Sequence, residues 1–156
     1  SFFTKDKYLV ENTKKLFKEV ADQASQGIQK LEKSKSRNIA CDLDERSLKS
    51  AKSNLDTAGL SSFVELLKED ATELEIKNLK GKILANPPYG ERLKSEELEA
   101  LYRDFGERMK NSFKDCQAYI LTANFEMIKK IQLKTAERMI VYNGNLESRL
   151  VRYNLY

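Results

Sequence analysis

KILANPPY, residues 82–89, joins a short apolar run to an asparagine, two prolines and a tyrosine. Prolines have no N–H group to donate, so the pair ends a strand at Ala85 and leaves rigid carbonyl groups beyond it. The amide of Asn86 and the ring of Tyr89 stand on either side of these carbonyls. Together they predict a small pocket at the end of a strand, with two acceptors beside a stacking face. Such a pocket suits a planar group with an exocyclic amine, such as a nucleobase.

The types of residue in Asn86-Pro87-Pro88-Tyr89 suit a reaction on that amine. An exocyclic amine is a poor nucleophile because its lone pair is delocalised into the ring. If the Asn86 side-chain oxygen and the Pro87 carbonyl accept its hydrogens, the lone pair turns toward an electrophile, and the same acceptors stabilise the developing positive charge. Tyr89 would stack on the base, worth about 1–3 kcal/mol. A plain proline turn is the structural alternative, and the strand, asparagine and tyrosine around it favour the functional interpretation.

The composition describes an ordinary globular protein of one domain, which we place at residues 1–156. Hydrophobic residues make up 40% and charged residues 33%, and the net charge of +4 permits an anionic partner. No apolar run approaches the roughly 20 residues of a membrane span, so we expect no membrane partner. Residues 1–7 lack the order of a signal peptide, which favours a cytoplasmic location. Cys41 and Cys116 are expected to be buried, reduced thiols.

The chain contains no histidine. This excludes Ser-His-Asp and Cys-His nucleophilic sites and removes the commonest metal ligand, so we expect no metal site. A reaction in this protein must therefore depend on positioning, on carbonyl acceptors and on an external cofactor.

The apolar periodicity alternates between helices and strands along the chain. Residues 5–33 predict one long amphipathic helix, and Asp44 and Gly59 predict the start and end of a second. The remaining elements are a buried strand at 38–43, strands at 63–67, 82–85 and 118–122, helices at 95–113 and 124–131, and a hairpin over 138–153 with Asn143-Gly144 in its turn. This order predicts an α/β fold with one open, mostly parallel sheet that ends in an antiparallel hairpin.

Polar residues follow three of the expected strands: Asp42, Asp70 and Asn86. Ligands of open α/β sheets bind outside the carboxyl ends of the strands. Asp42 is placed to accept hydrogen bonds from ribose hydroxyls, and Asp70 to accept one from an adenine amine, with the backbone N–H of Ala71 serving a ring nitrogen. Asp44 could add a contact, although its role as a helix cap is the simpler interpretation. Together these residues predict a nucleoside site.

The string Asn86-Pro87-Pro88-Tyr89 resembles the motif of S-adenosylmethionine-dependent methyltransferases that act on amino groups. Three longer segments look like the catalytic domain of the large-subunit ribosomal RNA guanine-N2 methyltransferases, which usually carry an RNA-binding THUMP domain. They are the extension of this motif through Gly90-Glu91-Arg92-Leu93, the segment Cys41-Asp42-Leu43-Asp44 and the segment 142–147. The resemblance implies a Rossmann-like methyltransferase fold, with S-adenosyl-L-methionine as cofactor. It also implies Asp42 at the cofactor ribose, Asp70 near its adenine, and residues 86–89 at the target base of ribosomal RNA.

One feature of that family has no counterpart in the chain. The glycine-rich loop that follows the family's first strand is absent, because the six glycines are scattered and none forms a Gly-x-Gly pair after a strand. We therefore expect a truncated fold, without the first strand and the glycine-rich loop, that binds cofactor poorly and is inactive alone. The exposed sheet edges of such a fragment favour a homo-oligomer.

Two other functions remain open from the sequence. The short motif is equally compatible with N6-adenine methylation of nucleic acid, and only the extended string favours guanine. A non-catalytic fragment that binds RNA or a partner is the third possibility. It predicts indifference to Asn86→Ala, whereas the enzyme requires that side chain.

Overall fold

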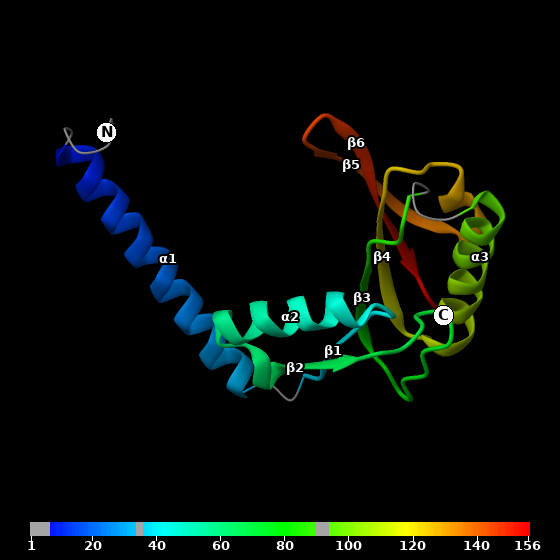
Figure 1. Ribbon diagram of the computed structural model, residues 1–156, viewed down its shortest axis with the longest axis horizontal. Helices are drawn as coiled ribbons and strands as arrows, with labels where there is room; N and C mark the ends of the chain where they lie inside the picture. The colour runs from blue at the N-terminus through cyan, green and yellow to red at the C-terminus, as the bar shows by residue number, and fades with distance from the viewer. Residues whose placement is uncertain (1–6, 34–35, 90–93) are drawn as a thin grey trace. The chain divides into compact units, whose positions relative to one another are not determined.

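The computed structural model describes residues 7–33, 36–89 and 94–156, and Gly90 to Leu93 of the extended motif lie outside it. The chain forms two compact units, Ser1–Lys68 and Glu69–Tyr156 (Figure 1). Each unit has its own sheet and its own helices, so the two are described in turn.

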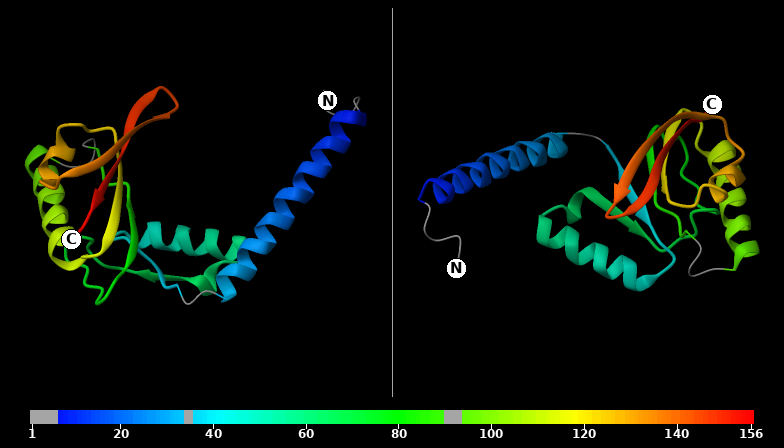
Figure 2. Two further views of the ribbon diagram at one scale, coloured as in Figure 1. Left: turned by 180° about the vertical axis from the view of Figure 1, so that it is seen from behind. Right: turned by 90° about the horizontal axis from the view of Figure 1, so that it is seen from above.

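The first unit contains two α-helices and a parallel pair of strands. Its elements are α1 (Lys7–Lys33), β1 (Asn38–Cys41), α2 (Glu45–Ala58), the 3₁₀ helix η2 (Ser61–Phe63) and β2 (Val64–Leu67). The helix expected over 5–33 is confirmed as one uninterrupted helix (Figure 2). Asn38 pairs with Val64 at one end of the two-stranded sheet, and Cys41 with Leu67 at the other.

Among the described residues of this unit none is fully buried, so the prediction of a buried strand at 38–43 is wrong. The strand ends at Cys41, and its side chains alternate between exposed and half-buried. Two strands with one short helix offer too little surface to exclude water from a side chain. The caps of α2 are as expected: Asp44 Oδ1 accepts a hydrogen bond from the Arg46 amide at 2.9 Å, and Gly59 ends the helix with a φ of 68°.

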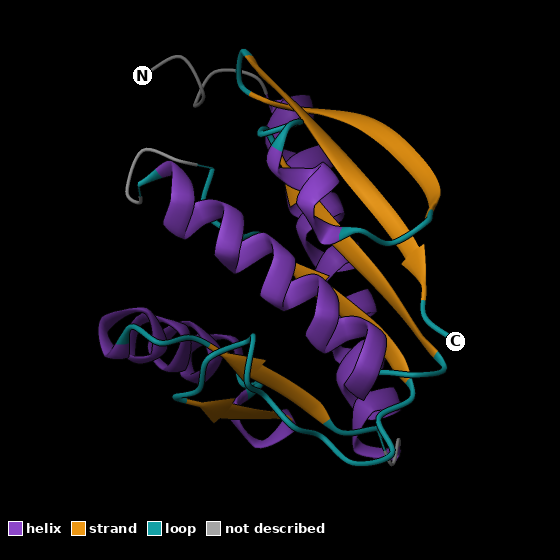
Figure 3. Cartoon of the chain, turned by 90° about the vertical axis from the view of Figure 1, so that its right-hand side faces the viewer, coloured by secondary structure: helices purple, strands orange, loops and turns teal. Residues whose placement is uncertain are grey.

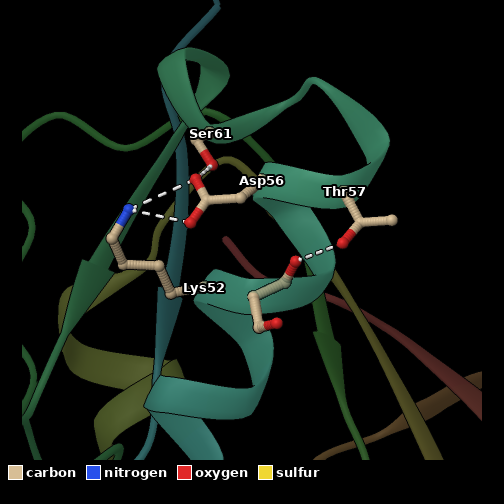
Figure 4. A network of polar contacts seen from close by, with 5 residues as sticks. Lys52, Asp56, Thr57 and Ser61 are labelled. Carbon is tan, nitrogen blue, oxygen red and sulfur yellow. Dashed lines mark hydrogen bonds and ion pairs between the residues drawn. The ribbon is translucent and has the colours of Figure 1, made fainter.

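The C-terminal end of α2 is fastened to η2 by a small polar network around Asp56 (Figure 4). The Ser61 hydroxyl donates to Asp56 Oδ1, and Lys52 Nζ lies 3.3 Å from both carboxylate oxygens. The Ser61 hydrogen bond, followed by the contact with Lys52, lowers the pKa of the Asp56 carboxyl. The ionised carboxylate is therefore the form that the folded unit favours.

This network predicts a pH dependence that Ser61→Ala removes. A carboxyl whose pKa is lowered by folding stabilises the folded state above its unfolded pKa of about 3.9, and this contribution is lost as the pH falls through the folded value. Ser61→Ala is expected to move the Asp56 pKa toward its ordinary value, measured by carboxyl ¹³C titration in NMR. Ser53→Ala is the matched control, because Ser53 bonds Thr57 through its backbone oxygen. An unchanged Asp56 titration in Ser61→Ala would contradict the assignment.

The second unit is a four-stranded mixed sheet with the strand order β3-β4-β6-β5. Its elements are β3 (Gly81–Ala85), α3 (Ser95–Ser112), β4 (Cys116–Thr122), the 3₁₀ helix η3 (Met127–Ile131), β5 (Thr135–Asn143) and β6 (Leu146–Asn154). The α/β class is confirmed, but the single, mostly parallel sheet is not: the described strands form two sheets. Only β3 and β4 are parallel in the larger sheet, because the hairpin inserts β6 antiparallel beside β4.

The hairpin of β5 and β6 is confirmed, with a turn one residue later than expected. Asn143 pairs with Leu146, so Gly144 and Asn145 form the turn instead of Asn143 and Gly144. Gly144 has a φ of 61°, a value that suits glycine at the first central position of a hairpin turn. The ladder starts at the pair Thr135 and Tyr153, and both strands are longer than the periodicity indicated.

The core of the second unit lies between α3, η3 and one face of the sheet (Figure 3). Alternate residues of β4 are buried there, together with one side of α3; the cluster comprises Leu98, Tyr102, Phe105, Met109, Phe113, Cys116, Ala118, Ile120, Met127, Ile131, Val151, Tyr153 and Leu155. Gly106 of α3 lies so close to η3 that a Cβ atom there would be 2.2 Å from the Ile131 carbonyl oxygen. Glycine at this position therefore sets how closely the helix and η3 approach.

The two cysteines are reduced thiols that form no disulfide with each other, as expected. Cys116 is buried and its Sγ donates to the Leu79 carbonyl at 3.3 Å, whereas Cys41 is only half-buried. Burial raises the pKa of the Cys116 thiol, which keeps it protonated and unreactive. In the described part of the chain, no helix has both the length and the apolar character needed to cross a membrane.

Candidate active site

The Asn86-Pro87-Pro88-Tyr89 motif begins immediately after β3 ends at Ala85, as the sequence predicts. The two prolines cannot continue the ladder with β4, whose parallel pairing ends at Ala85 and Ile120. The Asn86 side chain is exposed, and the ring of Tyr89 is half-buried. The Tyr89 hydroxyl donates a hydrogen bond to Asn86 Oδ1, so the two side chains at the ends of the motif contact each other.

The backbone carbonyls of the motif have different partners. The Pro88 carbonyl accepts a hydrogen bond from the Tyr102 hydroxyl at 3.2 Å, and the Tyr89 carbonyl accepts one from Asn124 Nδ2 at 2.9 Å. No described residue donates to the Pro87 carbonyl. Its oxygen therefore keeps its full acceptor capacity next to the side-chain oxygen of Asn86. These are the two acceptors that the sequence assigns to an incoming amine.

Asp70 and Ala71 are in the loop between β2 and β3, at the start of the second unit. Asp70 is half-buried, and its Oδ1 accepts hydrogen bonds from the Thr72 amide at 2.8 Å and the Thr72 hydroxyl at 2.7 Å. This double contact holds the carboxylate in one orientation. Among the described residues none accepts a hydrogen bond from the Ala71 amide. A fixed carboxylate beside an unused N–H group has the donor and acceptor that an adenine edge requires.

Asp42 and Asp44 belong to the first unit and are joined by a hydrogen bond. Asp42 follows β1 directly, and its Oδ1 accepts from the Asp44 amide at 2.8 Å. The Asp42 side chain is exposed and makes no ion pair with any described residue, so its second oxygen is available for a hydroxyl group. Asp44 is the N-cap of α2, and its carboxylate already accepts the Arg46 amide. A contact of Asp44 with a cofactor therefore stays a prediction.

Three residues beneath the motif were not identified from the sequence: Tyr102, Thr122 and Asn124. Tyr102 lies inside the helix expected at 95–113, and Asn124 is the first residue of the helix expected at 124–131. The available signal was the polar group on each: a buried tyrosine hydroxyl requires a partner, and an asparagine cap has a second polar atom to place. In the structure Tyr102 and Asn124 contact the backbone of Pro88 and Tyr89, and Thr122 Oγ1 lies 3.2 Å from the Tyr102 hydroxyl.

The Tyr102 side chain is 1% exposed, and burial raises the pKa of its hydroxyl, an effect opposed by the hydrogen bond with Thr122. The group therefore stays protonated at neutral pH and remains a donor toward the Pro88 carbonyl. Within the described residues there is no group of three or more aspartates, glutamates or cysteines arranged to hold a metal ion. The polar chemistry of this region thus consists of amides, carbonyls, hydroxyls and carboxylates.

An α/β sheet with Asn-Pro-Pro-Tyr at the end of a strand is the arrangement of Rossmann-like methyltransferases, and structural comparison agrees. A protein crystallised in complex with SAH, SMU.472, matches with a TM-score of 0.71 and 28% identity over 76% of this chain and 32% of its own. A structure from Listeria monocytogenes, described as a predicted N6-adenine-specific DNA methylase, matches with a TM-score of 0.65 and 28% identity over 76% of this chain and 30% of its own.

Residues 6–152 match the model of the RMKL-like methyltransferase domain, and the chain belongs to this family. Among curated proteins, the ribosomal RNA large subunit methyltransferase K/L of Methylococcus capsulatus is 34% identical over 147 residues. The match covers 94% of this chain and 19% of that protein, so the chain spans about a fifth of the length of this relative.

Proposed function

We propose that the chain forms part of an S-adenosylmethionine-dependent methyltransferase that modifies the N2 amine of guanine in large-subunit ribosomal RNA. The observation that carries this proposal is the state of the Asn86–Tyr89 motif. No described residue donates to its Pro87 carbonyl, and the adjacent Asn86 side chain presents a second acceptor at the end of β3. The family match supports the reaction class, and the similarity to methyltransferase K/L supports the RNA substrate.

The motif's residues would prepare the guanine amine for attack. Asn86 Oδ1 and the Pro87 oxygen accept its two hydrogens, which directs the nitrogen lone pair away from the ring plane. S-adenosylmethionine supplies an electrophilic methyl group. The same two oxygens stabilise the positive charge that grows on the nitrogen, and the surplus proton leaves to water afterwards. Stacking on Tyr89 holds the base, which must first leave its own helix if it is paired. No histidine is required.

We propose that the cofactor is bound by carboxylate and amide groups that can still form hydrogen bonds. Asp42 accepts hydrogen bonds from the ribose hydroxyls through its exposed carboxylate, and Asp44 lies beside it. Asp70 accepts from the adenine amine, and the Ala71 amide donates to the adjacent ring nitrogen. The Asn86 side chain is close to the methyl group that is transferred. We propose a cytoplasmic location, where a ribosomal RNA substrate such as that named for the relative would be available.

Methylation of the N6 amine of adenine is the second candidate. The similarity to the Listeria monocytogenes structure favours it, and the same two acceptors would serve the adenine amine equally well. The extended motif, including Glu91 and Arg92, is the feature that favours guanine, but these residues lie outside the described part of the chain.

Mass analysis of ribosomal RNA distinguishes the two candidates. Deletion of the natural gene is expected to remove one N2-methylguanosine from digested large-subunit RNA, and restoring the gene is expected to return it. Small-subunit RNA from the same cells is the internal control, because its modifications should stay constant. An unchanged N2-methylguanosine content would overturn the guanine assignment, and the loss of an N6-methyladenosine instead would establish the second candidate.

A further inference from the structure

A chain of hydrogen bonds runs from the end of β4 to the backbone of the Asn86–Tyr89 motif. The Tyr102 hydroxyl lies 3.2 Å from the Pro88 carbonyl and 3.2 Å from Thr122 Oγ1. A carbonyl can only accept, so Tyr102 donates to Pro88 and its oxygen accepts from the Thr122 hydroxyl. Thr122 Oγ1 in turn accepts the backbone N–H of Asn124 at 3.0 Å. The Tyr102 hydroxyl thus donates to the motif, and the Thr122 hydroxyl that supports it has a second, longer acceptor in the Asn124 carbonyl at 3.5 Å.

Asn124 contacts the motif independently with its side chain. Its Nδ2 donates to the Tyr89 carbonyl at 2.9 Å, and its Oδ1 accepts from the amide of Met127, the first residue of η3, at 3.1 Å. One planar amide therefore joins two segments 35 residues apart in sequence, the loop after β3 and the start of η3. The hydrogen bond from Met127 holds the plane of the Asn124 amide, and the orientation of this plane limits where the Tyr89 carbonyl can lie.

These contacts use the carbonyls of Pro88 and Tyr89, and within the described part of the chain nothing donates to the carbonyl of Pro87. Proline fixes φ at Pro87 and Pro88, so the backbone at this point has little remaining freedom. Two hydrogen bonds on the following carbonyls restrict what freedom is left. The direction of the Pro87 oxygen is thus set by groups that cannot themselves contact an amine held by Asn86 and Pro87.

We propose that Asn124 and Tyr102 are positioning residues for methyl transfer, which hold the carbonyls of Tyr89 and Pro88 so that the oxygens of Asn86 and Pro87 converge on one amine. This proposal rests on the proposed function. The two residues act on the geometry of the acceptors and not on the affinity for the methyl donor. A displacement of about 1 Å at a reacting group can cost on the order of 10²-fold in rate, so small movements of this loop are significant.

The sharpest test is Asn124→Asp, because it separates the two bonds of this side chain. Aspartate caps a helix as well as asparagine does, so the bond to Met127 and the stability of η3 are kept. It has no N–H group, so the bond to Tyr89 is replaced by repulsion between two oxygens. In the purified product of the natural gene, assayed on ribosomal RNA from the deletion strain, kcat is expected to fall about 10–100-fold. The KM for S-adenosylmethionine is expected to change less than about threefold.

Matched variants separate positioning from a general loss of structure. Asn111→Asp adds the same charge on the exposed side of α3 and is expected to leave kcat unchanged. Tyr102→Phe removes the hydroxyl under Pro88 and is expected to lower kcat. Tyr153→Phe removes another buried hydroxyl, which bonds Thr135, and is expected to lower only the melting temperature. If Asn124→Asp does not fold, Asn124→Ser replaces it, because serine can accept a hydrogen bond from the Met127 amide but is too short to reach Tyr89.

A wild-type kcat in a folded Asn124→Asp or Asn124→Ser protein would overturn the inference, as would equal losses in Tyr102→Phe and Tyr153→Phe. If the unmodified enzyme methylates no RNA, the proposed function fails separately. The hydrogen bond from Asn124 to Tyr89 is then tested by NMR alone. The Asn124 side-chain amide should exchange slowly with solvent, and Asn124→Asp should shift the Tyr89 ring resonances. Fast exchange, or unshifted Tyr89 resonances, would overturn the inference in that case too.

Discussion

Asn86→Ala is expected to lower the rate of methyl transfer by about 10²–10³-fold, the loss typical of removing one fixed polar group that stabilises the charge of a transition state. The substitution removes the side-chain acceptor and leaves the Pro87 carbonyl as the only oxygen for the amine. It also frees the Tyr89 hydroxyl, which donates to Asn86 in the structure. The measurement is kcat for RNA methylation by the product of the natural gene. A non-catalytic binding protein would show no such dependence.

Two variants make this result specific. Tyr89→Phe keeps the stacking ring and the Asn86 acceptor, so its rate should stay within about threefold of the wild type, whereas loss of the ring in Tyr89→Ala should cost the stacking energy of about 1–3 kcal/mol. Asn111→Ala removes an exposed amide from α3 and should leave the rate unchanged. A wild-type rate for Asn86→Ala would remove the motif from the reaction.

Gly106→Ala is expected to lower the free energy of unfolding of the second unit by about 1–3 kcal/mol. The new methyl group would lie 2.2 Å from the Ile131 carbonyl oxygen and 2.9 Å from its carbon, so α3 and η3 must separate. The favourable change in helix propensity, about 0.5–1 kcal/mol, is smaller than this cost. Amide hydrogen exchange of β4, which lies under both elements, measures the effect.

The matched control is Gly27→Ala, a helical glycine whose added Cβ would meet nothing within 4 Å. It is expected to stabilise α1 by about 0.5–1 kcal/mol, since only helix propensity changes. If Gly106→Ala protected the β4 amides as well as the wild type does, η3 would have to be free to move away from the helix at little cost.

Local elements were readily predicted from the sequence because their signals are local. The Asp44 cap, the Gly59 stop and the strand leading to Asn86 depend on neighbouring residues, and the structure confirms all three. The pairing of strands was not predictable in this way, since it depends on residues far apart in sequence. The insertion of β6 between β4 and β5 is set by contacts such as Ile120 with Val151, which no local pattern reveals.

The residues of the candidate site also differ in whether a local sequence pattern reveals them. The residues whose chemistry is distinctive for their position, Asn86 to Tyr89 and the acids after the strands, could be selected from the sequence alone. Tyr102 and Asn124 could not be selected in this way, because each also has a correct structural role that accounts for its presence in the sequence. Tyr102 belongs to the core, and Asn124 accepts a hydrogen bond from the amide of Met127, the first residue of η3. Their second contacts depend on the folding of a loop 14 and 35 residues away.

The bond from the Tyr89 hydroxyl to Asn86 Oδ1 also bears on which edge of a base the pocket accepts. Asn86 Oδ1 and the Pro87 oxygen are acceptors only. A ligand that displaces the Tyr89 hydroxyl therefore regains the lost hydrogen bond only when it brings N–H groups of its own. A base that presents a carbonyl edge would set oxygen against oxygen and leave a polar group unpaired, which is the strongest form of rejection available to a binding site. If the motif binds a base as we propose, it would discriminate by hydrogen-bond polarity and reject the carbonyl edge of a base that its amine edge would satisfy.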